Sequence, residues 1–159
     1  MSDGALKVGE PAPDFSLSAA DGTSVSLADF RDKQAVVLYF YPKDDTPGCT
    51  KEACAFRDLS AEFAAKGAVI LGVSPDSAES HLKFRDKFHL PFPLLADPDH
   101  AVAERYGVWK EKKNYGRTYM GIERTTVVIA RDGQVKKVFP RVRVDGHAEQ
   151  VLKALEELA

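Results

Sequence analysis

The alternation of apolar and polar runs along the chain predicts strands and helices that follow one another. A near-continuous apolar run over residues 35–41 and a second one over residues 68–73 have the character of buried central strands. Between them, apolar or small residues recur at helical spacing from Pro47 to about Ala65, which predicts one amphipathic helix. A second helix is expected from Ser77 to Phe88, and Pro91 stops it.

The segment before residue 35 and the end of the chain each contain a hairpin signal. Residues 15–27 carry Asp21-Gly22 between short alternating segments, which predicts an N-terminal hairpin. Near the other end, Asp132-Gly133 joins two apolar runs and predicts a second hairpin. The remaining expected elements are a short strand at Leu94-Leu95, a short helix over residues 99–106, strands over 125–130 and 134–139, and a last helix that Asp145 caps and that ends near Leu158.

This order of elements defines the fold class. Parallel strands with crossover helices, followed by an antiparallel hairpin and a helix, are typical of a thioredoxin-like three-layer α/β sandwich, here with an N-terminal hairpin extension. We expect residues 1–159 to form a single domain, since a chain of this length has the size of one. Roughly two-thirds of the unfolded surface can be buried at this size, so folding requires no disulfide or metal.

Composition and charge exclude several classes of protein. The formal net charge of -2, with both signs mixed, provides neither a basic surface for nucleic acid nor an acidic tail. No apolar run approaches the ~20 residues that span a bilayer, so we expect no membrane segment. The N-terminus lacks the basic and then apolar pattern of a secretory signal, and two cysteines do not make an extracellular disulfide framework. A reducing, cytoplasmic location is expected, although a mature chain whose leader has been removed would look the same.

The residues that can carry chemistry lie where the first buried strand runs into the first helix. Thr46 is a good N-cap and Pro47 is favoured at the first helical position, so the helix is expected to start here. Cys49 then occupies the third helical position, where unpaired backbone N–H groups and the helix dipole favour an anion. This setting predicts a nucleophilic thiolate at neutral pH. The alternative is a small buried hydrophobe, the usual role of a lone cysteine, which needs no such approach to a helix.

These residues resemble the active-site signature of a known family. The pattern Pro42-x-x-x-Thr46-x-x-Cys49 is similar to that of the peroxiredoxins, and Cys54 lies five positions further on, as in their bacterioferritin-comigratory, or Q-type, branch. Arg124 completes the match. The resemblance extends over most of the chain through five further segments: residues 8–15, 70–76, 92–97, 121–125 and 144–148.

The resemblance implies a peroxidase that needs no cofactor or metal. Its Cys49 thiolate would attack a hydroperoxide and become a sulfenic acid, while the Thr46 hydroxyl and the Arg124 guanidinium stabilise the reacting oxygens. Pro42 would shield the site from water. Cys54 would resolve the sulfenic acid as an intramolecular disulfide, which thioredoxin or glutaredoxin would reduce. Because both thiols lie in one chain, a monomer is expected to suffice.

Several of these residues also have ordinary structural interpretations. Cys54 could pack on the helix face, and Arg124 could be a surface charge paired with Glu123. Asp44 and Asp45 could bind a cation, but solvated loop charges are the simpler interpretation. The four histidines show no metal-ligand spacing with either cysteine, which favours structural or exposed roles for His81, His89, His100 and His147. The run Lys-Glu-Lys-Lys over residues 110–113 is most simply a solvated loop.

Three other functions compete with peroxide reduction. A thiol–disulfide oxidoreductase of the same fold uses two cysteines separated by two residues, whereas four residues separate Cys49 and Cys54. A copper-delivery module pairs two thiols with a histidine around the metal, which metal analysis of the purified protein would reveal. A non-catalytic holdase would not depend on Cys49.

Overall fold

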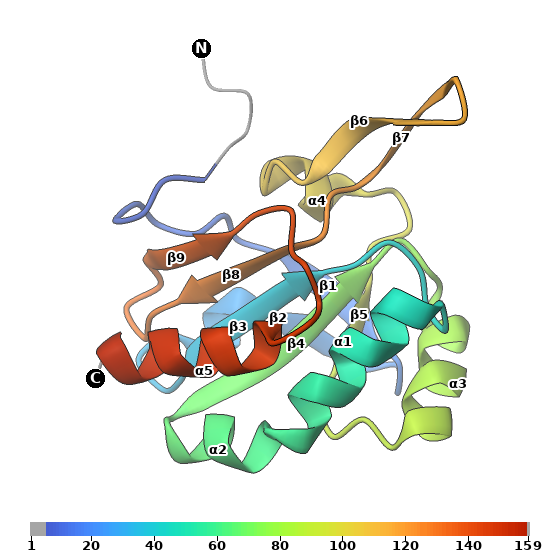
Figure 1. Ribbon diagram of the computed structural model, residues 1–159. Helices are drawn as coiled ribbons and strands as arrows, with labels where there is room; N and C mark the ends of the chain where they lie inside the picture. Colours follow the sequence, from blue (N-terminus) through green and yellow to red (C-terminus); the bar gives the residue numbers. More distant parts are fainter. Residues whose placement is uncertain (1–5, 159) are drawn as a thin grey trace.

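A mixed seven-stranded sheet forms the middle of the molecule (Figure 1). The computed structural model describes residues 6–158. The sheet has the strand order β2-β1-β5-β4-β3-β8-β9. Its strands are β1 (Ser16–Ala19), β2 (Ser24–Ser26), β3 (Ala35–Phe40), β4 (Ala68–Ser74), β5 (Leu94–Ala96), β8 (Thr125–Ile129) and β9 (Val135–Phe139). The helices are η1 (Leu27–Phe30), α1 (Pro47–Asp58), α2 (Ser60–Ala65), α3 (Ala78–Phe88), α4 (Ala101–Arg105) and α5 (His147–Leu158).

The two apolar runs form the central strands, as predicted. β3 pairs in parallel with β4 and antiparallel with β8, so it is covered by neighbours on both edges. Gly72 of β4 lies opposite Tyr39 of β3. A Cβ atom at residue 72 would lie 2.9 Å from the Tyr39 ring and from Leu94, so only glycine fits this position without a shift of its neighbours.

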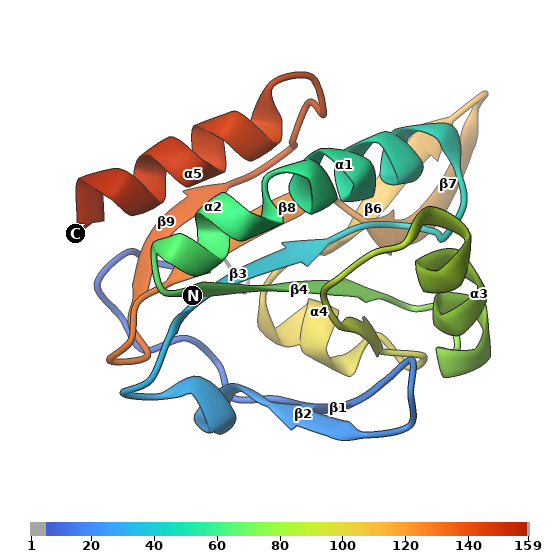
Figure 2. The same cartoon turned by 90° about the horizontal axis from the view of Figure 1, so that it is seen from below.

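Alternating side chains of β3 divide the core into two layers. Val36, Leu38 and Phe40 point into one cluster, which also contains the buried residues of the N-terminal segment and α4. The side chains at positions 37, 39 and 41 point into the other cluster, under α1, α2, α3 and α5. Figure 2 shows α1, α2 and α5 together on one side of the sheet and α4 on the other. The β1–β2 hairpin continues the sheet beyond β5. The predicted three layers and the N-terminal hairpin are therefore confirmed.

The single helix expected over residues 47–65 is interrupted at Leu59, so that prediction is wrong in its extent. Leu59 leaves helical geometry with φ -106° and ψ 7°, and its N–H bonds to the carbonyl of Phe56. The chain then resumes as α2. Phe56 and Phe63 both reach the core, with ring centroids 5.8 Å apart. Because both rings belong to one core cluster, α1 and α2 cover the same layer on either side of the interruption.

The last helix starts two residues later than the proposed cap. α5 begins at His147, and Gly146 precedes it with φ +72° and accepts a bond from the backbone of Gln150. The prediction of Asp145 as the N-cap is therefore wrong. Its carboxylate forms an ion pair with Lys51 of α1 instead. This pair connects the exposed side of α1 to the segment that leads into α5.

The expected loop over residues 110–113 is a strand. β6 (Trp109–Asn114) pairs antiparallel with β7 (Arg117–Ile122), and the two strands project beyond the main sheet (Figure 1). Tyr115 and Gly116 connect them, both with positive φ, as in the two-residue turns that match the twist of a hairpin. The run of four charged residues lacks the alternation that identifies a strand, and the hairpin depends on cross-strand pairing instead.

Candidate active site

A loop and a helix start place Cys49 at the end of the central strand. β3 runs into residues 42–46, and Thr46 is the N-cap of α1 with an extended backbone. Pro47 is the first helical residue, so Cys49 occupies the third position, as predicted. Its side chain is only 1% exposed and belongs to the core cluster under the helices. The thiol therefore lies at the positive end of α1 in a nearly water-free setting.

The Thr46 hydroxyl does not cap the helix. Its Oγ1 donates to the carbonyl of Lys43 at 2.9 Å, and it makes no side-chain bond to the backbone of α1. The simple interpretation of Thr46 as a side-chain cap is thus not what the structure shows. Pro42, the other residue of the predicted signature in this loop, is exposed.

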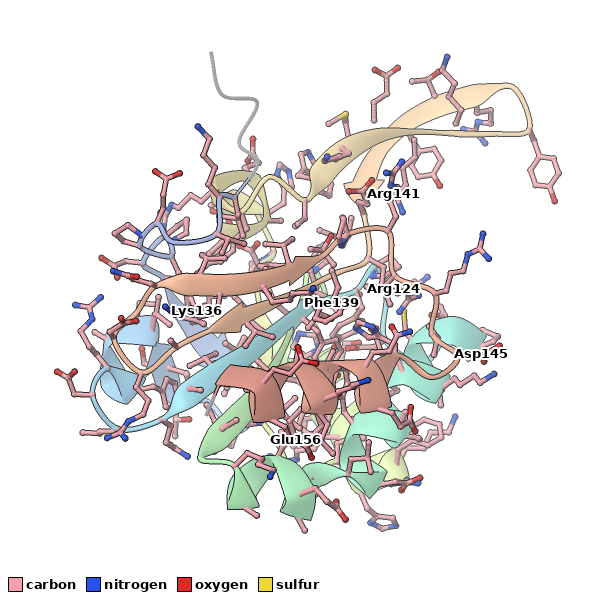
Figure 3. All side chains as sticks on the ribbon, turned by 60° about the vertical axis from the view of Figure 1, so that its left-hand side comes forward. Arg124, Lys136, Phe139, Arg141, Asp145 and Glu156 are labelled. Atoms are coloured by element: carbon pink, nitrogen blue, oxygen red, sulfur yellow. The ribbon has the colours of Figure 1, made fainter. Side chains whose placement is uncertain are left out.

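Arg124 reaches Cys49 from the segment between β7 and β8. Its Nη2 donates to the sulfur at 3.3 Å, although 75 residues separate the two in the sequence. The backbone carbonyl of Arg124 accepts a bond from Val142, which holds the residue at the start of β8, and Figure 3 labels it there. Arg124 does not pair with Glu123, which forms an ion pair with Lys110 at 3.5 Å. The alternative of a surface charge paired with Glu123 is therefore wrong.

Gly48 makes room for the guanidinium. A Cβ atom at this position would lie 3.2 Å from Arg124 Nη2, closer than most contacts of a real Cβ. The absence of a side chain on the first turn of α1 allows Arg124 to lie across it and reach the sulfur. The glycine of the Thr-Pro-Gly-Cys run thus has a packing role beyond its weak preference for helix.

Glu52 is the site residue that sequence reasoning missed. It lies three residues after Cys49 on the same face of α1, its side chain is 1% exposed, and its Oε1 accepts from Arg124 Nη1 at 2.6 Å. Burial raises the pKa of Glu52 from 4.5 to about 7, against the opposing charge and hydrogen bond of Arg124. Within residues 6–158, Glu52 Oε2 has no hydrogen-bond partner. The helical spacing from Cys49 was the available signal.

The Glu52 carboxylate and the thiol both affect the pKa of the Arg124 guanidinium. Burial alone would lower the pKa of this guanidinium, but the negative charges of Glu52 and Cys49 raise it above its ordinary value. The same guanidinium acts on His147, which donates to or accepts from Thr126 at 2.7 Å. Burial, with a smaller contribution from Arg124, lowers the pKa of His147 to about 4. Arg124 therefore stays cationic and His147 stays neutral near pH 7.

Cys54 lies on the same helix as Cys49, and both are free thiols. Residues five apart on an α-helix are separated by ~7.5 Å along the axis and ~140° around it, which places the two Cα atoms about 8 to 9 Å apart. A disulfide needs Cα atoms within ~7 Å. The structure is therefore that of the reduced protein, with Cys54 half-buried.

Asp44 is buried, contrary to the expectation of solvated charges in this loop. Its side chain is in contact with polar groups of α3, and only 8% of the residue is exposed. Asp45 is exposed, as expected, and forms an ion pair with Lys87 at 2.8 Å. His81 and His147 are buried with hydrogen-bond partners, which agrees with structural roles. In the described part of the chain, no three histidine, cysteine or acidic residues gather in a way that could hold a metal ion.

Comparison with known proteins identifies the family. The family model described as AhpC/TSA matches residues 8–138. Peroxiredoxin Bcp of Bacillus subtilis is 49% identical over 154 residues, which cover 97% of this chain and 98% of the relative. Peroxiredoxin Bcp of Escherichia coli is 46% identical over 154 residues, with the same coverage.

No helix among the described residues is long and apolar enough to cross a membrane.

Solved structures agree with the sequence relatives. The bacterioferritin comigratory protein of Xanthomonas campestris, studied for its alkyl peroxide reduction, superposes with a TM-score of 0.89 at 42% identity, over 95% of this chain and 98% of that one. Peroxiredoxin Q of the same organism gives a TM-score of 0.88 at 43% identity over 98% of both chains. The thioredoxin-like fold predicted from the sequence is confirmed.

Fold and site together define a thiol-based peroxidase, an oxidoreductase whose substrate is a peroxide and whose electrons come from a thiol reductant. The chain belongs to the AhpC/TSA family and, within it, to the Bcp or Q-type peroxiredoxins.

Proposed function

We propose that the protein reduces hydrogen peroxide and organic hydroperoxides through a Cys49 sulfenic acid, which Cys54 resolves and a protein dithiol recycles. The observation that supports this most directly is the hydrogen bond from Arg124 Nη2 to Cys49 Sγ at 3.3 Å. A permanently charged donor beside the sulfur can stabilise the negative charge of the reacting atoms. The alkyl peroxide reduction studied in the Xanthomonas campestris relative supports organic hydroperoxides as substrates.

In the first step the Cys49 thiolate attacks one oxygen of the hydroperoxide. A sulfur–oxygen bond forms as the oxygen–oxygen bond breaks, and the leaving oxygen takes a proton to become water or an alcohol. Arg124 stabilises the negative charge that develops on the leaving oxygen. Thr46 takes part by turning its hydroxyl from the carbonyl of Lys43 toward the peroxide, and Pro42 shields the loop side from water. No cofactor is required, because both electrons come from the sulfur.

In the second step Cys54 attacks the sulfenic acid of Cys49. A disulfide forms, the sulfur–oxygen bond breaks, and the hydroxide that leaves is protonated to water. Because a helix holds the two Cα atoms too far apart, residues 47–54 must unwind before the bond can form. Unwinding also carries the new disulfide to the surface, where a dithiol such as thioredoxin or glutaredoxin reduces it by exchange.

The proposed cycle needs only one chain. Both redox thiols belong to α1, so a single-domain monomer in the reducing cytoplasm can complete every step with its external dithiol. Light scattering after size exclusion should give the mass of one chain in both redox states. An obligate dimer in both states would contradict the monomer.

Variants of the two cysteines test the proposed chemistry. Stopped-flow mixing of the reduced protein with peroxide should show rapid consumption by the wild type and none by Cys49→Ser. Cys54→Ser should react once, retain one oxygen atom on Cys49 in the mass spectrum, and lose turnover with thioredoxin. Oxidation that appears first on Cys54, or consumption that survives Cys49→Ser, would overturn the assignment.

A further inference from the structure

A buried polar cluster lies directly behind the loop that leads to Cys49. Asp44 accepts hydrogen bonds from the Tyr41 hydroxyl at 2.6 Å and from the Ser80 hydroxyl at 2.8 Å. Asp44 Oδ2 also lies 2.7 Å from His81 Nδ1. His81 is completely buried on α3, and Tyr41 is buried at the end of β3. Among the hydrogen bonds of residues 6–158, none joins these side chains to the thiol, and none of them takes part in the proposed steps.

The hydrogen-bond partners of His81 fix the protons of this cluster. Nε2 lies 2.9 Å from the carbonyl oxygen of Leu95, which can only accept, so Nε2 carries a proton. A neutral ring would then present a lone pair from Nδ1 to a carboxylate oxygen at 2.7 Å, which is repulsive. A proton must therefore lie between Nδ1 and Asp44. The Tyr41 and Ser80 hydroxyls both donate to Asp44 and stabilise its ionised form, which favours the imidazole side of the bond for the shared proton.

The cluster holds the loop by its backbone as well as by its side chains. The amide of Asp44 donates to Asp76 Oδ2 at 2.7 Å, and that carboxylate is held in turn by Ser74 at 3.0 Å. The next residue, Asp45, has φ +57°, a conformation that costs energy in a non-glycine residue and persists only where neighbours impose it. The chain is thus fixed two residues before Thr46, where α1 begins.

We propose that Asp44 and His81 are positioning residues for the peroxide reaction. This inference rests on the proposed function of Cys49. The pair holds the loop end of α1 in the arrangement that places the thiol against Arg124, and it stays in place when residues 47–54 unwind. The pair therefore serves the reaction with peroxide, and the unwinding that precedes the disulfide does not depend on it. The other titratable groups in contact with it are Tyr41 and Asp76.

Two neighbouring aspartates provide a test variant and its control. Together they distinguish the positioning role of Asp44 from the effect of removing any negative charge from this loop. Asp44→Asn keeps the size of the side chain but removes the carboxylate that faces His81. Asp45→Asn removes the same charge from the same loop and loses only the exposed pair with Lys87. Sulfenic acid formation, measured by stopped flow, should fall by a factor of order 10 to 10² in Asp44→Asn, as expected for a misplaced reacting group. It should stay within about twofold of wild type in Asp45→Asn, where positioning is intact.

Two further measurements distinguish positioning from a loss of folding. The subsequent formation of the Cys49–Cys54 disulfide should be as fast in Asp44→Asn as in the wild type. Nitrogen NMR of the His81 ring should show both nitrogens protonated in the wild type and in Asp45→Asn, and one of them unprotonated in Asp44→Asn. If Asp44→Asn does not fold, Ser80→Ala removes one hydrogen bond from the same oxygen and should give a smaller fall in the same rate.

Each outcome has a definite meaning. An unchanged rate of sulfenic acid formation in folded Asp44→Asn would overturn the positioning role, and so would a neutral His81 ring in the wild type. Peroxide consumption that does not depend on Cys49 would overturn the proposed function itself. The NMR result on the ring does not depend on peroxide, so the two failures can be told apart.

Discussion

Glu52 and Cys49 lie one helical turn apart on α1 and bind the same guanidinium group. Arg124 donates from Nη1 to the carboxylate and from Nη2 to the thiol. The shorter bond, to Glu52, fixes the rotation of the planar guanidinium and leaves its second nitrogen directed at the sulfur. Because both acceptors belong to α1, the unwinding that we propose for disulfide formation would remove both contacts at once.

Removal of the guanidinium should slow the first chemical step. We expect Arg124→Ala to lower the rate constant for sulfenic acid formation by a factor of order 10² to 10³, the usual effect of losing one donor to the transition state. Arg143→Ala removes the same charge from an exposed position and serves as the control. Stopped-flow kinetics on both variants measure the effect, and equal rates in Arg124→Ala and the wild type would exclude a catalytic role.

Glu52 should make the stability of the protein depend on pH. Its pKa of about 7 in the folded state lies above the ordinary value of 4.5, so the folded state binds more protons between these values. The contribution of Glu52 to the free energy of unfolding is therefore fully present below about pH 4.5 and declines as the pH rises to about 7, by about 3 kcal/mol.

Urea unfolding at pH 5 and pH 8 tests this expectation. Between pH 5 and pH 8 the free energy of unfolding of the wild type should fall relative to that of Glu52→Gln, because the amide of the variant cannot ionise. Glu62→Gln, on the exposed side of α2, should show no such change. A difference between wild type and Glu52→Gln that is the same at both pH values would show that Glu52 does not titrate in this range.

Oxidation should unwind the beginning of α1. Amide hydrogen exchange over residues 47–58 is expected to be much faster in the oxidised protein, since the disulfide cannot form within a helix. Residues 68–74 of β4 provide the internal control, because they lie in the middle of the sheet. Equal protection of α1 in both redox states would mean that the Cys49–Cys54 disulfide does not form.

A methyl group at position 48 should slow two steps of the proposed cycle for two different reasons. Gly48→Ala favours the helix by up to about 1 kcal/mol and should slow the unwinding that precedes the disulfide. The same methyl group would crowd Arg124 Nη2, 3.2 Å away, and should slow the attack on peroxide as well. Separate measurement of sulfenic acid formation and disulfide formation will show both effects. A faster disulfide step would contradict the requirement for unwinding.

Local signals in the sequence were sufficient for the start of α1 but not for the partners of the thiol. A strand, a loop and a helix start can be identified from the apolar run and from Thr46 and Pro47, because the backbone preference of each residue is a local property. Arg124 was found only through resemblance to a family, since nothing local connects it to Cys49. Its contact is a product of the antiparallel pairing of β3 with β8.

The burial of two charged residues could not be predicted from the sequence. Glu52 and Asp44 have the chemical character of surface residues, and their burial follows from partners on distant elements, Arg124 and His81. The β6–β7 hairpin was missed for a related reason, because its strands are mostly polar and are defined by each other rather than by a buried face.

The burial of Cys49 limits which molecules can approach its sulfur, according to their size. A side chain that is 1% exposed can be approached by a peroxide of a few atoms but not by the surface of a folded protein. In the proposed cycle, a bulky disulfide or a protein thiol would reach the sulfur only after α1 has unwound. In the proposed cycle, burial would therefore let the oxidant react first and the reductant second, and it would keep Cys49 of the reduced protein from exchange with other thiols.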